Sequence, residues 1–517
     1  MTKRFNVTGL CFPEQHYMAD ISKKLDKTMQ MVEQGDYFVI NRPRQYGKTT
    51  LLYRIADLLT AKGYVVLNMS FEGLGDAMFE NEADFAEGFA ELLATYASVS
   101  IPDLEEWLLE KVPTTQTLKQ VSKLITQFVS KTDKKIVLLI DEVDKSSNNQ
   151  LFVSFLAMLR NKFLERGTFK TFHSVVLAGL HDVKTLKLKL RPDDERKLNS
   201  PWNIAADYTV DMNLQIGEIE PMLADYCHET GVAMDISWFA ARLFYHTSGY
   251  PFLVSRLCKT IAEDIVPDKT EKTWTSEDLA EAVERLLRAS NTNFDSLIKS
   301  LENDQALYDL VYGILMEGDM ILFNIHDPLL NIGLLHGIFR NDRYVKIHNR
   351  IYEQVIYNYM TSKTTTTLKS KHNYAEHFVL DNDGLDMPAV LLKFQQFMKE
   401  EYNEKDKTFL EQHGRLVFLS FLNPILNGKG HSFKEVQTSE EKRLDIVATY
   451  NEHKYIIELK RWYGEVSHQK GIAQLSDYLD IHALKAGFLV IFEYNKKKSN
   501  RKEWIEYGDK KIFAVWI

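Results

Sequence analysis

The chain has few cysteines and no long apolar run, and both shortages limit what it can be. Its 517 residues contain three cysteines, Cys11, Cys227 and Cys258, which are far apart and show no paired-ligand spacing. Neither a disulfide framework nor a zinc knuckle is therefore indicated. No apolar run approaches the roughly 18 to 20 residues of a membrane span, and the start of the chain lacks the apolar core of a secretion signal. We expect a cytoplasmic protein with no membrane partner.

The chain also lacks an excess of positive charge. It has 63 Lys and Arg against 72 Asp and Glu, a formal net charge of -9. This balance argues against a surface coated for nonspecific nucleic-acid binding, so any such contact must be confined to one region. Ordinary globular composition and this length predict two to four folded domains.

The first half of the sequence alternates short apolar runs with helical patterns. The runs are residues 37–41, 64–70, 136–140, 174–178 and 208–212. This alternation predicts an α/β core, residues 1–213, with a parallel sheet and crossover helices. Beyond it only helical patterns occur, at 218–231, 237–247, 252–265 and 276–290. We therefore expect a helical lid at 214–295.

The second half begins with more helices and a strand-like alternation at 344–348. This pattern predicts a winged-helix-like module at 296–360. Residues 361–367 are polar and without periodicity, which indicates a loop, and we place a linker at 361–388. Helical patterns at 389–414 and 415–426 and an extended pattern at 445–460 then predict a C-terminal α/β domain, residues 389–517.

A phosphate-binding loop follows the first apolar run. A loop for ATP needs inward-pointing backbone N–H groups, a lysine for the outer phosphates and a hydroxyl for Mg²⁺, which Gly47, Lys48 and Thr49 supply. An arginine-rich strand-to-helix turn is the alternative reading of the loop alone. The predicted ATP-binding residues are Arg42, Pro43, Arg44, Gln45, Tyr46, Gly47, Lys48, Thr49 and Thr50.

Two adjacent carboxylates end the third apolar run. Asp141 and Glu142 follow the strand-like residues 136–140 directly. Such a strand end places one carboxylate near Mg²⁺, together with Thr49, and the other where it orients the attacking water. We predict that Asp141 binds the metal and that Glu142 is catalytic.

A second candidate site lies near the C-terminus, on two strands joined by residues 451–454. If the hairpin turns about residues 452 and 453, Asp445 lies opposite Lys460 and Val447 opposite Glu458. Because alternate residues share a face, Asp445, Glu458 and Lys460 then point the same way. Carboxylates that hold divalent ions beside a lysine are suited to phosphodiester hydrolysis. The alternative is a surface hairpin with an ordinary salt bridge.

The loop and the Asp141–Glu142 pair resemble those of AAA-like P-loop ATPases near the STAND and archaeal ATPase groups. Members of that class tolerate an arginine at the position of Arg42. The resemblance implies that Pro251, in the run 248–251, faces the nucleotide from the lid, although a simple turn before a helix fits equally. It also implies a polar phosphate sensor at His181 or Asp182. No arginine finger can be assigned, although Arg191 and Arg196 lie in a suitable polar stretch.

The C-terminal pattern resembles the PD-(D/E)XK nuclease superfamily, with Leu444 at the usual proline position. The resemblance implies a further acidic metal ligand on a preceding helix, Glu411 first and Glu435 second. Gln474 and Tyr478 are similar to the polar pair of the following helix, unless they only border its buried face. The basic run 496–502 either contacts phosphates or is a solvated loop.

The order of the two halves is similar to that of bacterial AAA-like ATPases with a nuclease domain, some from anti-phage defence or mobile elements. We therefore expect an ATP-regulated nuclease that uses Mg²⁺, or Mn²⁺ at the nuclease site, with DNA as the expected partner. The sequence leaves open whether the chain forms a homo-oligomer. The alternative is a nucleotide-dependent switch or scaffold whose nuclease-like domain binds nucleic acid or protein without cleavage; a translocase ranks last because helicase motifs are absent.

Overall fold

The computed structural model places the described residues in two compact units. The first comprises Met1–Asn293, Asn331–Phe339 and His348–Arg350, and the second comprises Phe294–Leu330, Arg340–Ile347 and Ile351–Ile517. The structure describes residues 2–73, 76–143, 150–179, 202, 204–317, 319, 321–367, 378–380, 382–401, 417–419, 421–422, 425–426, 430–435, 445–451, 453–462, 464–481, 484–493 and 501–517.

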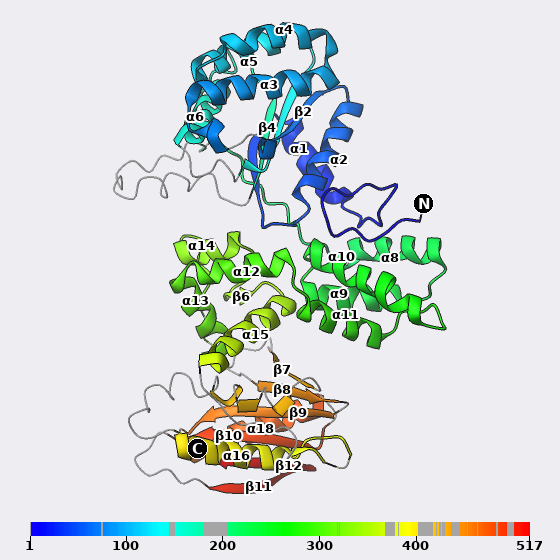
Figure 1. The fold of residues 1–517 in the computed structure, drawn as a ribbon, viewed down its shortest axis with the longest axis vertical. Helices are drawn as coiled ribbons and strands as arrows, with labels where there is room; N and C mark the ends of the chain where they lie inside the picture. Colours follow the sequence, from blue (N-terminus) through cyan, green and yellow to red (C-terminus); the bar gives the residue numbers. More distant parts are fainter. Residues whose placement is uncertain are drawn as a thin grey trace. The chain divides into compact units, whose positions relative to one another are not determined.

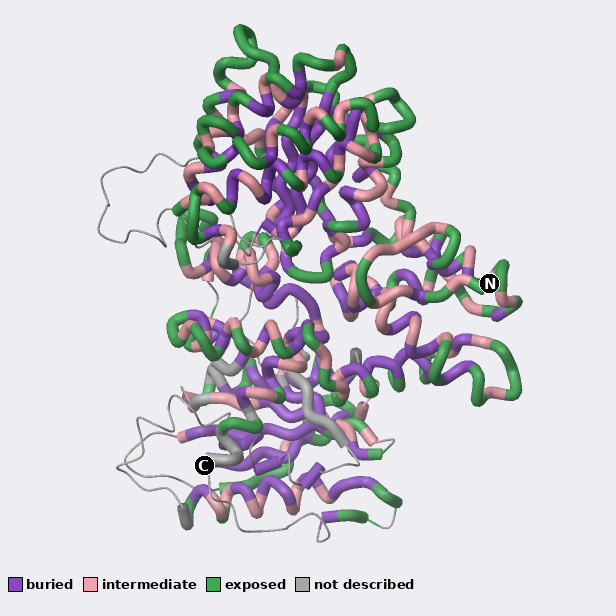
Figure 2. The backbone as a smooth tube through the Cα atoms, turned by 45° about the horizontal axis from the view of Figure 1, so that its top comes forward, coloured by how far each residue is buried: buried purple, intermediate pink, exposed green. Residues whose placement is uncertain are grey.

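The first unit is built on a four-stranded parallel sheet (Figure 1). Its strands β1 (Tyr37–Asn41), β2 (Val65–Ser70), β3 (Ile136–Asp141) and β4 (Ser174–Gly179) lie in the order β1-β4-β3-β2. Strands β3 and β4 are buried along their whole length, as strands covered on both faces by helices are (Figure 2). The predicted α/β fold with a parallel sheet is confirmed.

Helices connect and cover these strands. Because their apolar residues recur at helical spacing, each helix buries one side against the sheet or a neighbouring helix. They are α1 (Ser22–Glu33), α2 (Lys48–Ala61), α3 (Glu82–Ser100), α4 (Glu105–Lys111), α5 (Leu118–Ser130) and α6 (Gln150–Leu164).

The prediction of a fifth strand at residues 208–212 is wrong. Here the chain forms one parallel bridge, between Ala206 and Phe38 beside β1, and then continues without strand pairing. Tyr208 and Val210 are buried, which explains the strand-like pattern. The carbonyl of Val210, however, accepts from the Arg42 guanidinium at 2.9 Å. The Arg42 side chain thus takes the carbonyl that, in a strand, would accept from the backbone of the neighbouring strand.

The predicted helical segment after the core is confirmed. It contains α8 (Ile216–Thr230), α9 (Ile236–Thr247), α10 (Pro251–Lys259), the π-helical turn η7 (Thr260–Ile265) and α11 (Ser276–Arg288). Local signals fix the ends: Gln215 and Thr275 form capping boxes with Glu218 and Asp278, and Gly231 adopts a left-handed conformation after α8.

A mixture of helices and a two-stranded ladder follows. The elements are α12 (Thr292–Glu302), α13 (Gln305–Tyr312), α14 (Pro328–Leu335), β5 (Phe339–Arg340), β6 (Lys346–Ile347) and α15 (Arg350–Thr367). The winged-helix-like module stays a prediction. The loop predicted from residue 361 is wrong as far as Thr367, because α15 continues through the threonine run. An established helix extends more easily than a new one starts, even through weak helix formers.

The C-terminal part contains a six-stranded mixed sheet. Its order is β11-β12-β10-β9-β8-β7, with β10 parallel to β9 and β12. The strands are β7 (Gly430–Glu435), β8 (Asp445–Tyr450), β9 (His453–Arg461), β10 (Ala486–Phe492), β11 (Lys502–Tyr507) and β12 (Lys510–Trp516), and the helices α16 (Met387–Glu401) and α18 (Glu465–Ile481) pack on them. Leu475 and Leu479 of α18 join Val447, Ile456 and Leu489 of the sheet in one apolar core.

Candidate functional site

The phosphate loop joins the carboxyl end of β1 to the amino end of α2. The backbone of Gly47, directly before the helix, has a φ of 77°, which glycine adopts without strain. The first backbone N–H groups of a helix have no partner within the helix and favour anions. The loop thus has the local geometry that the sequence predicts for a phosphate site.

Lys48 is buried and held by its own loop. Its Nζ donates to the carbonyl oxygens of Arg42 at 2.8 Å and Pro43 at 2.9 Å, and the residue is 8% exposed. The ammonium is therefore positioned inside the loop. The structure brings it to the place where outer phosphates would lie in an ATP-binding loop.

Thr49 and Asp141 come together from two elements. The Thr49 hydroxyl donates to Asp141 Oδ2 at 2.6 Å, and Asp141 Oδ1 accepts from the backbone N–H of Glu142 at 2.9 Å. Asp141 is 6% exposed, and Glu142 has a left-handed φ of 56° that turns the chain out of β3. A hydroxyl and a carboxylate are oxygen ligands of the kind that Mg²⁺ prefers. These residues therefore fit a magnesium ion.

Arg42 contacts the neighbouring chain segment. Its guanidinium donates to the carbonyl oxygens of Asn41 and Val210, each at 2.9 Å, and lies 5.7 Å from the ring centre of Tyr208. The arginine at the first loop position thus attaches residues 208–210 to β1. Its predicted contact with the nucleotide stays a prediction.

Tyr46 joins the phosphate loop to two distant segments of the same unit. Its hydroxyl donates to Asn213 Oδ1 at 2.5 Å and lies 2.6 Å from His348 Nε2. Burial raises the pKa of the Tyr46 phenol well above its usual range. The hydroxyl therefore stays protonated and available as a donor.

A second tyrosine and a glycine also contact the loop. Tyr250 donates to the carbonyl of Arg44 at 2.6 Å and packs edge-on against Tyr46 with ring centres 4.5 Å apart. Gly337 is so close that an added Cβ would lie 2.7 Å from Pro43 Cγ. Tyr250 directly precedes Pro251, the first residue of α10. Sequence reasoning missed these contacts, and only an aromatic residue inside the loop was available as a signal.

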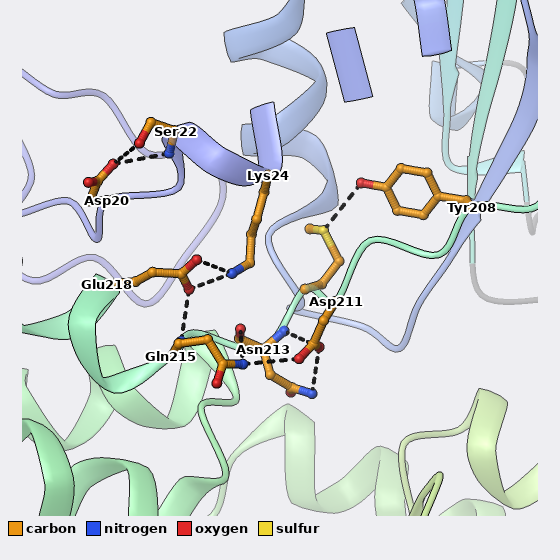
Figure 3. A network of polar contacts seen from close by, with 9 residues as sticks. Asp20, Ser22, Lys24, Tyr208, Asp211, Asn213, Gln215 and Glu218 are labelled. Atoms are coloured by element: carbon orange, nitrogen blue, oxygen red, sulfur yellow. Dashed lines mark hydrogen bonds and ion pairs between the residues drawn. The ribbon is translucent and has the colours of Figure 1, made fainter. Parts of the chain in front are cut away.

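The same contacts continue into a polar network between α1 and α8 (Figure 3). Asp211 Oδ1 accepts from the backbone N–H and side-chain amide of Asn213, both at 3.0 Å, and Asp211 Oδ2 accepts from Gln215 at 3.0 Å. The buried Lys24 of α1 forms an ion pair with Glu218 of α8. The network thus connects the phosphate loop, through Asn213, to α8, the first helix after Asn213.

The two candidates for the phosphate sensor, His181 and Asp182, lie outside the described residues, so this role stays a prediction. Arg191 and Arg196, to which the sequence assigns no role, also lie outside them.

The hairpin of the second candidate site has a different register from the predicted one. Asp445 pairs with Glu458, and Val447 with Ile456, because the chain reverses between the paired residues Tyr450 and His453. Asn451 has a φ of 50°, a conformation that such tight turns need and asparagine tolerates. The predicted pairing of Asp445 with Lys460 is therefore wrong by two residues. A two-residue shift leaves each residue on the same face of the sheet, so the predicted common face does not depend on this error.

Lys460 lies between Glu458 and Gln474. Its Nζ is 2.9 Å from Glu458 Oε1 and donates to Gln474 Oε1 at 3.0 Å. Glu458 is 3% exposed, and a carboxylate so buried needs a charge partner or a metal. Gly471 of α18 makes room for the lysine, because an added Cβ would lie 2.6 Å from Nζ. The structure thus brings three predicted residues together.

The remaining predicted nuclease residues are only partly described. The backbone of Asp445 lies directly opposite Glu458, whereas the side chains of Asp445 and Glu435 and all of Glu411 lie outside the description. Tyr478 is buried in the apolar core beside Leu475, and the polar role implied for it stays a prediction. Within the described ranges, no group of three or more His, Cys, Asp or Glu residues could hold a metal ion.

Comparison with known proteins bears on the first half of the chain. Residues 13–266 match the model of the AAA-like domain family, a span that includes the core sheet, the phosphate loop and α8 to α10. No curated protein matches the chain. The family match ends before the C-terminal sheet and therefore does not describe that part of the chain.

Several solved structures are similar at low identity. A Walker-type ATPase of Pyrococcus abyssi is 13% identical over 68% of this chain and 99% of that chain, with a TM-score of 0.45. A RuvB variant of Thermotoga maritima is 15% identical over 69% and 96%, with a TM-score of 0.35. The ORC2 protein of Aeropyrum pernix, with ADPNP and ADP, is 11% identical over 70% and 98%, with a TM-score of 0.37.

No described helix is both long and apolar enough to cross a bilayer.

Proposed function

We propose that the first unit binds and hydrolyses ATP with Mg²⁺, and that its nucleotide state regulates a metal-dependent nuclease in the C-terminal part, with DNA as the substrate. One observation carries the ATPase proposal: Thr49 donates to Asp141 at 2.6 Å directly beside the buried Lys48. A lysine, a hydroxyl and a strand-end carboxylate are the set that phosphoryl transfer from ATP requires. The AAA-like match over residues 13–266 supports it.

Each residue has a chemical role in this proposal. Lys48 exchanges its two loop carbonyls for oxygens of the outer phosphates, an exchange favoured because phosphate carries full negative charge. Thr49 and Asp141 hold Mg²⁺, which neutralises charge on the phosphates. Glu142, at the turn after β3, accepts a hydrogen bond from the attacking water and orients it.

The ATPase test compares two lysine variants. Lys48→Ala removes the phosphate contact, whereas Lys27→Ala removes an exposed lysine of α1 in the same unit. Phosphate release from ATP is measured with the full chain and Mg²⁺. We expect turnover to be lost in Lys48→Ala and unchanged in Lys27→Ala. Equal turnover in Lys48→Ala and the parent protein would refute ATP hydrolysis at this loop.

The nuclease proposal rests on Glu458, Lys460 and Gln474. A buried carboxylate, a lysine 2.9 Å from it and an amide 3.0 Å from the lysine lie together, and the backbone of Asp445 is directly opposite Glu458. Asp445 and Glu458 would hold the metal ion, which activates water and stabilises charge on the scissile phosphate. Lys460 would then leave Glu458 and neutralise the phosphate.

The nuclease test uses Asp445→Ala and Lys48→Ala side by side. Labelled single- and double-stranded DNA and RNA are incubated with each protein, with Mg²⁺ or Mn²⁺, with and without ATP. We expect cleavage by the parent protein, none by Asp445→Ala, and altered ATP dependence in Lys48→Ala. ATP turnover by Asp445→Ala should equal that of the parent protein. Cleavage that survives in Asp445→Ala would refute the assignment of this site.

The direct ion pair between Glu458 and Lys460 also supports a second function. Because Lys460 already neutralises Glu458, this carboxylate does not require a metal as its charge partner, which suits a nuclease-like fold used only for binding. In this alternative the chain is a nucleotide-dependent switch or scaffold. Retained binding of nucleic acid without cleavage under every metal condition would favour it.

A further inference from the structure

Two neighbouring hollows lie on the ATPase unit away from the phosphate loop. The first has a volume of about 460 Å³, and its lining includes residues that precede β1, β3 and β4, among them Gly35, Lys135 and His173. The second has a volume of about 410 Å³ and is lined by residues of α4 and the end of α5. Val129 and Thr132 line the first hollow, and Ser130 and Lys131, between them in the sequence, line the second. The two hollows are therefore adjacent.

The first hollow is at the opposite end of the parallel sheet from the phosphate loop. The phosphate loop follows the carboxyl end of β1, and Asp141 ends β3. A strand of five or six residues separates these ends by about 17–20 Å. A ligand here would leave the ATP site free.

Both hollows are cationic. Lys134, Lys135, Arg166 and Lys170 line the first, together with one carboxylate, Asp133. Lys111 and Lys131 line the second, which has no acidic residue. Within the described part of the chain, none of these six cations forms an ion pair. The local excess of positive charge is opposite in sign to the net charge of -9 of the whole chain.

An aromatic residue accompanies each hollow. Beside the first hollow, Phe169 directly precedes the lining residue Lys170 and is 54% exposed. Trp107 is half-buried and has the Lys131 ammonium 4.7 Å from its ring centre. Cations that follow a phosphate backbone, with aromatic rings on which bases stack, are the two components of single-strand binding sites.

We propose that these two hollows form a binding site for single-stranded nucleic acid on the ATPase unit, with the strand's phosphates on the six cations and bases stacked on Phe169 and Trp107. Two hollows in a row fit an extended strand, whereas a small phosphate ion would use one cluster and no aromatic ring. The site recognises backbone and stacking, so it discriminates little between sequences.

The test measures binding of a fluorescent single-stranded oligonucleotide, longer than one site of about 4–16 nucleotides, to the full chain in EDTA. EDTA prevents cleavage, so failure of the nuclease proposal does not affect the result. Lys134→Ala/Lys170→Ala is compared with Lys23→Ala/Lys27→Ala, which removes two exposed lysines from α1 of the same unit. Phe169→Ala tests stacking. ATP turnover of each variant reports that the unit is folded.

We expect Lys134→Ala/Lys170→Ala to bind at least about tenfold more weakly at low salt. The slope of log affinity against log salt should decrease by about 1.4, or about 0.7 for each lost phosphate contact. Phe169→Ala should weaken binding by about fivefold or more with no change in that slope. The α1 control should bind as the parent protein does.

Three results would overturn the proposal. Equal affinity of Lys134→Ala/Lys170→Ala and the parent protein would place the contact elsewhere. Equal weakening in both double variants would show an effect of total charge only. Unchanged affinity in Phe169→Ala, together with full displacement of the oligonucleotide by inorganic tripolyphosphate, would identify a small-anion site instead of a strand-binding site.

Discussion

The hydroxyl of Tyr46 lies 2.6 Å from Nε2 of His348, although 302 positions separate them in the sequence. The surrounding contacts assign the direction of this hydrogen bond. The amide nitrogen Nδ2 of Asn349 lies 3.2 Å from His348 Nδ1 and can only donate. His348 Nδ1 is therefore the acceptor, and the ring proton is on Nε2. His348 then donates to Tyr46, and Tyr46 donates to Asn213. The phosphate loop is therefore fixed from outside by directed, buried hydrogen bonds.

Tyr46→Phe should loosen this loop. The substitution keeps the ring against Tyr250 but removes the shared partner of Asn213 and His348, which should cost about 1–3 kcal/mol of unfolding free energy. A less ordered loop should also bind ATP more weakly. Thermal unfolding and titration with a fluorescent ATP analogue measure the two effects. Tyr507→Phe, at a tyrosine that is 40% exposed, is the matched control and should change neither.

Glu142→Gln should separate binding from hydrolysis. The amide keeps the size of the side chain but no longer attracts the proton of the attacking water, so turnover should fall by about 10²- to 10⁴-fold. Affinity for ATP should stay within about twofold, because Lys48 and Asp141 are intact. Steady-state phosphate release and analogue titration measure these. Asp141→Asn, one residue earlier, should instead raise the Mg²⁺ concentration needed for half-maximal turnover. Parental turnover in Glu142→Gln would contradict the role of the carboxylate.

Features encoded within a few residues could be predicted from the sequence. The phosphate loop and its helix depend on Gly47 and the residues beside it, and the strand end Asp141–Glu142 follows directly from an apolar run. The partners of Tyr46 could not be predicted, because Asn213 and His348 are brought to it only by the complete fold. Local patterns do not specify which distant segment covers a loop.

Two errors show how the sequence pattern and backbone pairing differ. Residues 208–212 have the buried alternation of a strand, yet Arg42 takes the carbonyl of Val210 and the ladder does not form. In the C-terminal hairpin, the pattern specifies which residues share a face but not the register within that face. Only the turn at Asn451 decides between registers that differ by two residues.

Lys460→Ala should make the stability of the C-terminal part depend on divalent metal. Glu458 is 3% exposed, so removal of its partner leaves a buried carboxylate uncompensated and should cost about 3–5 kcal/mol in EDTA. If Glu458 is a metal ligand, Mn²⁺ should restore much of this loss, and more than it stabilises the parent protein. Melting curves with and without Mn²⁺ measure the effect.

The matched control is Lys485→Ala. Lys485 also forms a lysine–carboxylate ion pair, with Asp509, but its side chain is 77% exposed. Exposed pairs contribute about 0–1 kcal/mol, so this variant should melt close to the parent protein in both buffers. A Lys460→Ala protein that melts at the same temperature with and without Mn²⁺ would oppose a metal site at Glu458.

His246 should make the first unit less stable in mild acid. Burial, with further contributions from Arg350 and Arg242, lowers the pKa of its imidazole to about 4. The unfolded chain binds this proton near pH 6.5, whereas the folded protein binds it only near pH 4, so the free energy of unfolding decreases as pH falls between these values. We expect a loss of about 1–2 kcal/mol, below the full linkage value because the ring is partly exposed.

A glutamine at this position should remove that part of the pH dependence, because it cannot take up the proton. The difference in melting temperature between about pH 7.5 and about pH 5 should therefore be smaller in His246→Gln than in the parent protein. His326→Gln, at an exposed histidine, should keep the parental difference. If His246→Gln shows the same difference as the parent protein, other groups produce the acid sensitivity, and burial together with the charges of Arg350 and Arg242 does not keep this imidazole neutral.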